Sequence, residues 1–344
     1  MEKIRLIIPT RVEHCAQIIT GFLMLKEQGW DVEVIDNSRK PNTPYRDLPA
    51  VQAEYRGKKL FYDVWDGYQD PEDMELGLEF CDYYFKRSFS QEKNRELFPN
   101  YAEKIHSLGF NYYVTHPANP IREPLWKAVL RPLQGRTAER YFMSKVFEGD
   151  GEVPGSDPPR ILFLARLWGR EDWLEGDPAN DEREQISRNR IEIIRTLRQE
   201  YGDSFIGGIN DCRLSRELAP DLIVPGELTE RRRYLRAMHG SDICIGTAGL
   251  HGSIGWKTGE YVAAAKAIVH EQMLYSVPGS FTEGVNYLSF RTAEECVEAV
   301  AKLVENPERI RAMKKANAAY YQQYLRPDML VKNTLKTVDQ AMEK

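Results

Sequence analysis

Short apolar segments that alternate with amphipathic segments constrain the fold of this chain more than any other feature. Residues 3–9 (KIRLIIP) have the branched apolar composition of a buried strand. Residues 15–28 then carry apolar side chains at helical spacing as far as Gly29, and residues 30–35 (WDVEVI) indicate a second strand. Strands joined by a helix run parallel, because a parallel pair needs a long crossover. The sequence therefore predicts an α/β protein.

The alternation stops once, at residues 148–160 (EGDGEVPGSDPPR), where glycine, proline and acidic residues replace apolar periodicity. This composition is typical of an interdomain linker. Before it, further strands are predicted at 59–64, 83–86 and 110–115, and helical sequence at 122–147. After it, strands are predicted at 161–167, 204–209, 221–226 and 242–248, with helices at 187–202 and 229–240 and a nearly all-helical stretch from 292 to 344.

A length of 344 residues exceeds the usual size of a single hydrophobic core. We therefore expect two Rossmann-like, doubly wound domains that face each other across a cleft. The expected boundaries are 1–150 for the first domain and 158–325 for the second. A helical tail is expected at 326–344.

Composition excludes several classes of function. No apolar run approaches the roughly 20 residues that cross a bilayer, and the first residues contain only a short apolar core, so a cytoplasmic protein is expected. Peripheral association with a membrane surface stays compatible with the sequence. A net charge of -5 gives no overall attraction for nucleic acid. Five dispersed cysteines form no C-x-x-C pair, and no D-x-D occurs, so neither a bound metal nor another cofactor is expected.

Residues 251–269 (HGSIGWKTGEYVAAAKAIV) follow a predicted strand and lead into a helix expected to begin at Gly259 or Glu260. Unpaired N–H groups at a helix start favour an anion, and Lys257, Thr258 and Ser253 add a charge and hydroxyl donors suited to phosphate. A carboxylate would repel phosphate, so Glu260 suits a pair of ribose hydroxyls better. Alternatively, Thr258 is a plain N-cap and Glu260 a first-turn acid that needs no ligand.

This segment resembles the glycine-bearing loop and the E-A-x-A-x-G-x-P-V-V stretch of GT-B glycosyltransferases of the family-1-like type, which use nucleotide sugars. The resemblance implies that Glu260 holds the donor ribose. Retaining members carry an acid eight residues earlier that contacts the donor sugar, but here that position is Gly252. Sugar contacts must then come from elsewhere, such as His251 or backbone N–H groups, and the stereochemical outcome stays open. Ala265 and Ala267 replace the usual glycine and proline.

Two further segments are similar to the same family. RILFLARLWGRED (160–172) resembles the first strand and loop of the donor domain, which implies that Arg166 reaches the diphosphate. IVPGELTERRRYLRAMHGSDICIG (223–246) is similar to the nucleobase segment, with its loop at Pro225–Glu227. The donor-site residues expected from these arguments are Arg166, Gly226, Glu227, His251, Ser253, Gly255, Lys257, Thr258 and Glu260.

The first half should hold the acceptor and, for an inverting reaction, a general base. His14, Glu13 and Asp66 follow predicted strands, at the edge where parallel sheets bind ligands. Arg11 and His116 follow strands as well, and His116 is the weaker candidate. Aromatic faces interleaved with carboxylates also suit a sugar, and LFYDVWDGYQDPED provides them in Asp63, Trp65, Asp66 and Tyr68. An ordinary surface loop has the same composition as this segment. For His14, the alternative is a residue at a helix start that takes no part in catalysis.

The resulting expectation is a metal-independent glycosyltransferase. It would move a sugar from a nucleotide diphosphate sugar, of the UDP type, to a saccharide or glycoconjugate acceptor in bacterial-type glycan biosynthesis. Two alternatives stay open. A GT-B-shaped epimerase or hydrolase would release product without an acceptor, and a non-catalytic nucleotide-binding protein would consume no donor. A dinucleotide oxidoreductase is disfavoured because no G-x-G-x-x-G follows a strand.

Overall fold

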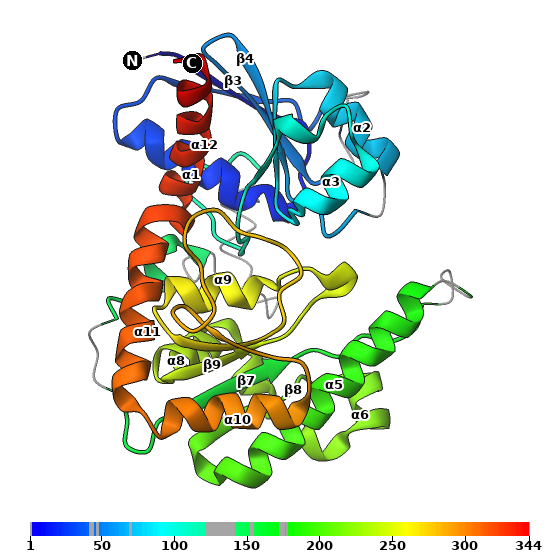
Figure 1. Cartoon of the computed structure of the whole chain (residues 1–344), viewed down its shortest axis with the longest axis vertical. Helices are drawn as coiled ribbons and strands as arrows, with labels where there is room; N and C mark the ends of the chain where they lie inside the picture. The colour runs from blue at the N-terminus through cyan, green and yellow to red at the C-terminus, as the bar shows by residue number, and fades with distance from the viewer. Residues whose placement is uncertain are drawn as a thin grey trace. The chain divides into compact units, whose positions relative to one another are not determined.

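The computed structural model describes residues 2–40, 45, 48–68, 71–121, 142–151, 155–171, 176 and 178–343 (Figure 1). The helix predicted before the linker lies largely outside these residues. The chain forms two compact units. Unit 1 comprises Met1–Lys145, Leu274–Gly279 and Gln322–Lys344, and unit 2 comprises Val146–Met273 and Ser280–Tyr321.

Unit 1 contains a six-stranded sheet in the order β2-β1-β3-β4-β5-β6. All strands except β3 point the same way, since β3 pairs antiparallel with both β1 and β4. The side chains of β1 that face the core are apolar and buried, whereas Arg5 between them is exposed. The strands are β1 (Ile4–Ile8), β2 (Val32–Asp36), β3 (Ala50–Tyr55), β4 (Lys58–Asp63), β5 (Tyr83–Lys86) and β6 (Ile105–Ser107).

The helices of unit 1 include two that lie far apart in sequence but side by side in space (Figure 1). Helix α12 contributes Leu330, Val331 and Leu335 to the same core as β1 and α1. Gly21 lies at the contact between α1 and α12. The helices are α1 (Ala16–Glu27), α2 (Pro71–Phe80), α3 (Gln91–Leu97) and α12 (Pro327–Met342).

Unit 2 contains a five-stranded, fully parallel sheet in the order β11-β10-β9-β7-β8. Along the chain the order starts at β7, continues to β8 on one side and then passes to β9 on the other. The direction of winding therefore reverses between β7 and β9, and ligands bind at such a switch point in open α/β sheets. The strands are β7 (Ile161–Ala165), β8 (Phe205–Ile209), β9 (Ile243–Gly246), β10 (Ala267–Glu271) and β11 (Leu288–Phe290).

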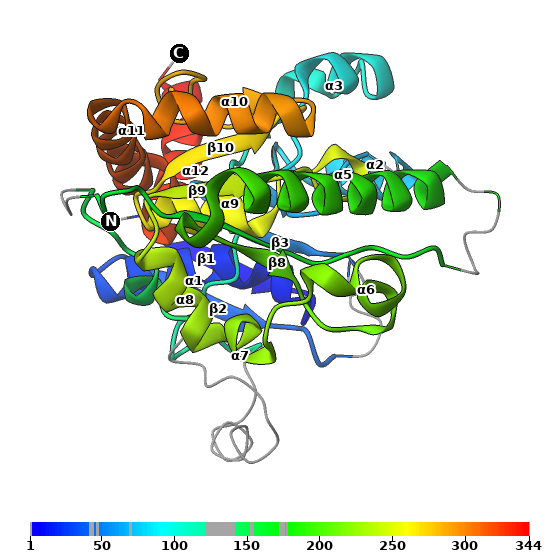
Figure 2. The same ribbon diagram turned by 90° about the horizontal axis from the view of Figure 1, so that it is seen from below.

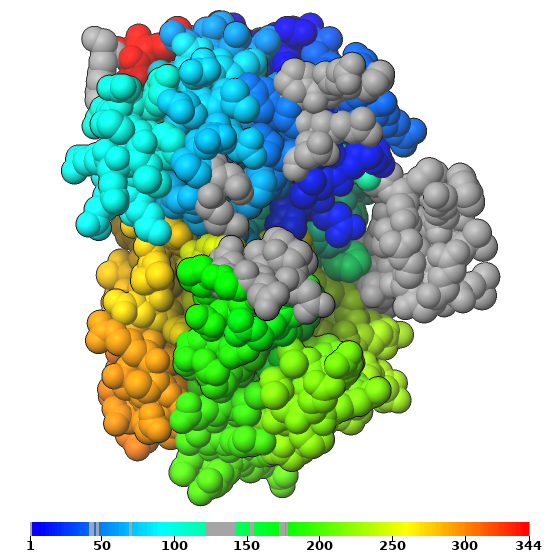
Figure 3. All heavy atoms as spheres, turned by 90° about the vertical axis from the view of Figure 1, so that its right-hand side faces the viewer, coloured from blue at the N-terminus to red at the C-terminus, as the bar shows by residue number. Residues whose placement is uncertain are grey.

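The helices of unit 2 cover this sheet. Helices α5 and α10 run side by side (Figure 2), and the outer side of α5 lies on the surface of the unit (Figure 3). Helix α10 starts at the N-cap Thr292, and α11 starts at the N-cap Asn306 with Pro307 in its first turn. The helices are α5 (Pro178–Tyr201), α6 (Arg213–Leu218), α7 (Gly226–Thr229), α8 (Arg231–His239), α9 (Trp256–Ala263), α10 (Ala293–Val304) and α11 (Pro307–Tyr320).

The described part of the predicted linker packs on unit 2. The N–H of Gly149 donates to Ala263 O at 2.9 Å. The hydroxyl of Ser156 donates to Asp242 Oδ2 at 2.6 Å, and the N–H of Arg160 donates to the same oxygen at 3.2 Å. The chain leaves unit 1 at Lys145, before this segment begins.

Two predicted strands are wrong. Residues 110–115 are extended, but the backbone N–H of Tyr112 donates to the Gln17 side chain at 3.2 Å instead of to a strand, and β6 lies earlier in the sequence. Residues 221–226 begin with a 3₁₀ turn and make only an isolated bridge between Ile223 and Ile209. The sequence analysis also missed β3 and β11.

The helix predicted from Gly259 or Glu260 begins earlier, at Trp256, with Gly255 as its N-cap. At its other end, Ala265 has a φ of +51°, a left-handed conformation that glycine adopts without strain. The two doubly wound, parallel-rich sheets themselves confirm the predicted α/β class.

Candidate functional site

The switch point of unit 2, between the carboxyl ends of β7 and β9, is spanned by one side chain of α5. Arg190 Nη1 donates to Arg166 O at 2.6 Å after β7, and its Nη2 donates to Ala248 O at 3.0 Å after β9. Its Nε donates to Thr247 Oγ1 at 3.0 Å. Burial lowers the pKa of Arg190 to about 10, so the guanidinium remains charged at neutral pH. Arg190 thus holds both loops of the switch point in place.

Lys257 lies in the first turn of α9 and directs its ammonium to the same switch point. Its Nζ donates to Leu164 O in β7 and lies 5.4 Å from the centre of the Tyr234 ring. The pKa of Lys257 is lowered to about 8, mainly by burial; the charge of Glu260 opposes this shift, and the charges of Arg190, Arg231 and Arg166 add to it. We call Arg166, Arg190, Arg231 and Lys257 the cation cluster. Four cations that oppose one another's charge make this region electropositive, and an anion would relieve their repulsion.

Glu260, the residue assigned to a donor ribose, is bound by two neighbours. Its Oε1 accepts from Arg231 Nη2 at 2.9 Å, and its Oε2 accepts from the Tyr234 hydroxyl at 2.7 Å. The residue is 3% exposed. A carboxylate has about four acceptor positions, so each oxygen retains one. The ribose role remains a prediction, but the alternative of a first-turn acid is wrong because Glu260 lies past the first turn of α9.

Thr258 lies inside the helix and is not its N-cap. Its hydroxyl is 2.9 Å from His270 Nε2, and both residues are buried. Burial lowers the pKa of His270 to about 4, which keeps the imidazole neutral. Ser253 is buried too, whereas Gly255 is partly exposed at the N-cap. The structure therefore uses the Thr258 hydroxyl to join α9 to β10.

The remaining donor-site candidates lie on three loops. The Arg166 guanidinium stacks at 4.4 Å from the Trp168 ring centre. Gly226 and Glu227 form the exposed start of α7, where Glu227 pairs with Arg233. His251 lies in the loop between β9 and α9, with a left-handed φ of +59°. Arg166 and Lys257 come together at the switch point. The predicted role of Gly226 and Glu227, contact with the nucleobase of the donor, stays a prediction.

The contacts that α5 makes with the loops were not predicted, although Ser187 and Arg190 lie inside the helix expected at 187–202. The helix begins at Pro178, and its first half carries polar side chains that reach the loop after β7. Ser187 exchanges hydrogen bonds with the Trp168 backbone, at 2.8 Å each. The polar residues Asn180, Arg183, Ser187 and Arg190 recur at helical spacing, and this stripe was the signal available in the sequence.

In unit 1, side chains after β1, β4 and β5 gather at one edge of the sheet. His14 lies in a 3₁₀ turn after β1, Asp66 follows β4 and Arg87 follows β5. Arg87 Nη1 and Asp66 Oδ1 form an ion pair at 2.5 Å. Burial lowers the pKa of His14, the charge of Arg87 lowers it further, and Asp66 opposes them. The structure thus brings two predicted catalytic candidates together, around an arginine that sequence analysis did not single out.

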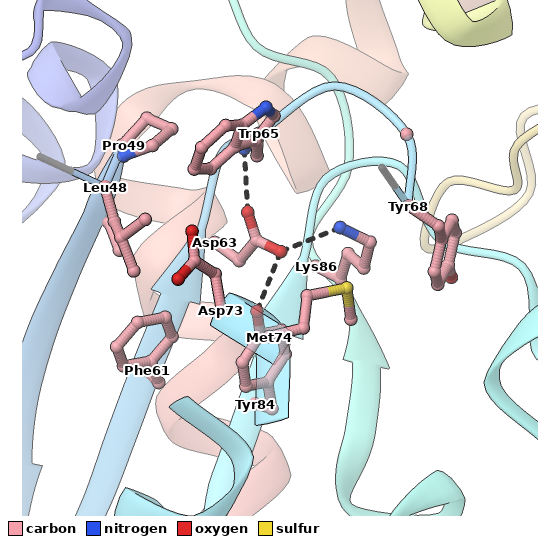
Figure 4. A pocket seen from close by; sticks show the side chains of 12 residues that line it. Leu48, Pro49, Phe61, Asp63, Trp65, Tyr68, Asp73, Met74, Tyr84 and Lys86 are labelled. Carbon is pink, nitrogen blue, oxygen red and sulfur yellow. Dashed lines mark hydrogen bonds and ion pairs between the residues drawn. The ribbon is translucent and has the colours of Figure 1, made fainter. Parts of the chain in front are cut away.

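Asp63 belongs to a network inside unit 1 (Figure 4). Its Oδ2 accepts from Lys86 Nζ at 2.7 Å and from the Tyr84 hydroxyl at 2.8 Å, and its Oδ1 accepts from the Trp65 N–H at 2.7 Å. The Lys86 ammonium lies 4.7 Å from the centre of the Tyr68 ring. These residues line a hollow of about 20 Å³, which has room for a single water molecule. A sugar that uses these aromatic faces must bind outside the hollow.

The other candidates of the first half take different positions. Glu13 is exposed, next to His14. Arg11 Nη2 donates to Ile121 O at 2.9 Å. His116 is buried, and its Nε2 lies 3.0 Å from Glu27 Oε1. We therefore regard His116 as a structural residue.

Two further observations concern the described residues alone. None of their helices combines the length and apolarity that crossing a bilayer requires. Their histidine, cysteine and acidic side chains form no group of three or more that could hold a metal ion.

Comparisons with known proteins were made for the sequence and for the structure. A family model described as glycosyl transferase-like matches residues 179–335. No curated protein matches the sequence. Similar solved structures include sucrose-phosphate synthase from Thermosynechococcus elongatus, at 12% identity, with 94% of this chain and 92% of that chain covered and a TM-score of 0.39.

Two more solved structures were found. HepE from Anabaena in complex with UDP-glucose shares 13% identity, with 92% of this chain and 88% of that chain covered and a TM-score of 0.40. The C-terminal domain of a glycosyl transferase group 1 family protein from Francisella tularensis shares 11% identity, with 52% and 95% covered and a TM-score of 0.36.

The family match covers α5 from residue 179 onward, the loop after β9, and α9, but it begins after β7 and Arg166. The chain therefore carries a glycosyl transferase-like domain and is a transferase that acts in glycosyl transfer.

Proposed function

We propose that this chain transfers a sugar from a nucleoside diphosphate sugar to an acceptor hydroxyl, and that unit 2 binds the donor. The cation cluster at the switch point carries the proposal. Arg166 and Lys257 adjoin the strand ends where parallel sheets bind ligands, and Arg190 fixes the loops around them. Glu260 already pairs with Arg231, and a diphosphate would supply anionic charge for the other cations of the cluster.

Unit 1 is proposed to bind the acceptor and to supply the base. The acceptor oxygen attacks the anomeric carbon while the bond from that carbon to the diphosphate oxygen breaks. The acceptor proton moves to His14, whose lowered pKa keeps the imidazole neutral and able to accept it at pH 7. Arg87 and Asp66 hold this edge of the sheet in place through their ion pair.

The nucleoside diphosphate leaves with one more negative charge than it had in the donor. Arg166 and Lys257 stabilise that charge, and so do N–H groups at the start of α9, which begins beside them. These groups are positioned before the reaction, so they need little reorganisation as the charge develops. We propose that they replace a divalent cation.

The finer assignments extend this proposal. We take UDP as the first nucleotide to test and a saccharide or glycoconjugate as the acceptor. A role in bacterial-type glycan biosynthesis, in the cytoplasm and in peripheral contact with a membrane, fits such an acceptor.

A thermal-shift panel of UDP, GDP, ADP, CDP and dTDP tests the donor site. A ligand at a hundred times its Kd stabilises the protein by about 2.7 kcal/mol, so the cognate nucleotide should raise the Tm by several degrees. Lys257→Met should weaken its binding at least tenfold, because an ion pair with the diphosphate is lost. Lys302→Met, an exposed change on α10, should leave binding unchanged.

Two results would contradict the donor site: no nucleoside diphosphate raises the Tm, or the two lysine variants behave alike. Incubation of the protein with a bound UDP sugar and no acceptor then addresses the alternatives. Rapid release of free sugar would favour a hydrolase or epimerase over a transferase.

A further inference from the structure

The loop between β9 and α9 receives a carboxylate from α5. The Gly252 N–H donates to Glu182 Oε1 at 3.1 Å, and His251 Nδ1 lies 3.8 Å from Glu182 Oε2. His251 and Gly252 both have left-handed φ values, of +59° and +65°. Gly252 lies eight residues before Glu260, where the sequence provides no acidic side chain. The tertiary structure places the carboxylate of Glu182, from α5, beside this loop.

The base of this loop is held by other residues. Arg190 binds Thr247 and Ala248, and the N–H of Ala248 donates to Glu271 Oε2 at 2.9 Å. Ala248 also forms an antiparallel bridge with Ile254. The position of the loop on β9 is therefore set without Glu182.

Among the described residues, Glu182 is more exposed than Glu260, and it has more unused acceptor positions than Glu271. Its side chain is 32% exposed and that of His251 is 28% exposed, whereas the Glu260 side chain is 5% exposed. Glu271 uses one oxygen for Ala248 and the other for the Asn189 amide, at 3.5 Å. Glu182 keeps acceptor positions on both oxygens and is open to a ligand.

We propose that Glu182 binds hydroxyl groups of the donor sugar. A carboxylate accepts hydrogen bonds from a pair of vicinal hydroxyls, but it repels a diphosphate. The sugar is attached to the diphosphate, and Glu182 contacts the loop that leads directly into α9 and Lys257. Glu182 is thus a specificity-determining residue for the sugar half of the donor. The assignment rests on the proposed function of unit 2.

Glu182→Gln tests the assignment, because glutamine keeps one oxygen to accept from the Gly252 N–H but removes the charge and replaces the second acceptor oxygen with an NH2 group. The probes are UDP and UDP-glucose, with Kd measured by calorimetry for the wild-type protein and the variant. We expect the Kd of UDP to change less than twofold and that of UDP-glucose to rise about tenfold or more, as for a lost hydrogen bond to a charged group. The kcat should fall too, and the Tm should stay unchanged.

Glu184→Gln is the matched control. Glu184 lies two residues further along α5 and pairs with Arg170 at 3.1 Å and Arg188 at 3.4 Å on the surface. This variant should bind both probes like the wild-type protein.

Three results would overturn the assignment. Equal weakening of UDP and UDP-glucose would mean that Glu182 only holds the loop, and no weakening of either would mean that it contacts no ligand. In both cases the wild-type protein still binds UDP, and the proposed function stands. If the wild-type protein binds neither probe nor any other nucleoside diphosphate, the proposed function fails together with the assignment.

Discussion

The guanidinium of Arg190 joins two loops that follow different strands of one sheet. It donates to three oxygens, and its planar fork matches their arrangement. A buried charge that loses its hydrogen-bond partners is costly, so the geometry of this site depends on all three contacts.

We expect Arg190→Lys to weaken binding of the cognate nucleoside diphosphate at least tenfold and to lower the free energy of unfolding by about 2 kcal/mol, because an ammonium cannot reach all three acceptors. Calorimetry and urea denaturation measure the two effects. Arg188→Lys, on the exposed side of α5, is the control and should change neither. Wild-type affinity in the Arg190→Lys protein would show that the two loops hold their positions without this contact.

His14 gives the reaction a predictable dependence on pH. Burial and Arg87 lower its pKa below the ordinary 6.5, so the imidazole loses activity as a base only when the pH falls through that lower value. We expect kcat/KM to be level near pH 7 and to decline on the acidic side. In His14→Asn, kcat should fall by roughly 10² to 10⁴, the usual contribution of a general base, and the acidic decline should disappear.

His106 is a matched control for this measurement. Burial lowers its pKa as well, but its ring stacks on Tyr83 in the sheet of unit 1. His106→Asn should keep the acidic decline of the wild-type profile. If the decline persists in His14→Asn instead, the base is another group, with Glu13 and Asp66 as the next candidates.

At the scale of elements, the packing of α12 on α1 requires a residue without a side chain. A Cβ built on Gly21 would lie 2.2 Å from Pro327 O and 2.6 Å from Val331 Cγ2. Real contacts are never this short, so α12 would have to move away from α1. Leu330, Val331 and Leu335 are buried by this contact and would lose part of their packing.

We expect Gly21→Ala to destabilise unit 1 by about 1–3 kcal/mol, in the range of overpacked cores, despite the better helix propensity of alanine. Urea denaturation, monitored by circular dichroism, gives the change. Lys26→Ala, at an exposed position of the same helix, should have an effect within about 0.5 kcal/mol. Equal stability of the two variants would show that α12 adapts to the extra methyl group at no cost.

Among the elements, long periodic segments were predictable and short irregular ones were not. Helices α1 and α8 and strands β1 and β7 agree with their sequence patterns to within a few residues. Residues 110–115 have the composition of a strand, but the backbone N–H of Tyr112 binds the Gln17 side chain of α1 instead of a neighbouring strand. The composition of a segment does not predict which groups its backbone will bind. Strand β3 was not predicted, although residues 51–55 (VQAEY) alternate apolar and polar side chains, the period-two signal of a strand.

At the scale of the whole molecule, the sequence by itself determined the α/β class and the presence of two sheets, and it predicted the part of unit 2 where we propose that an anion binds. These follow from hydrophobic periodicity and from the position of glycine and charged residues after strands, which are local properties. The tertiary structure alone decided which side chains meet. Arg190 spans the switch point, Arg87 pairs with Asp66 and acts on the pKa of His14, and Glu182 reaches Gly252, 70 residues away in the sequence. Such contacts depend on how helices pack on their sheets, and this packing cannot be predicted from the order of residues along the chain.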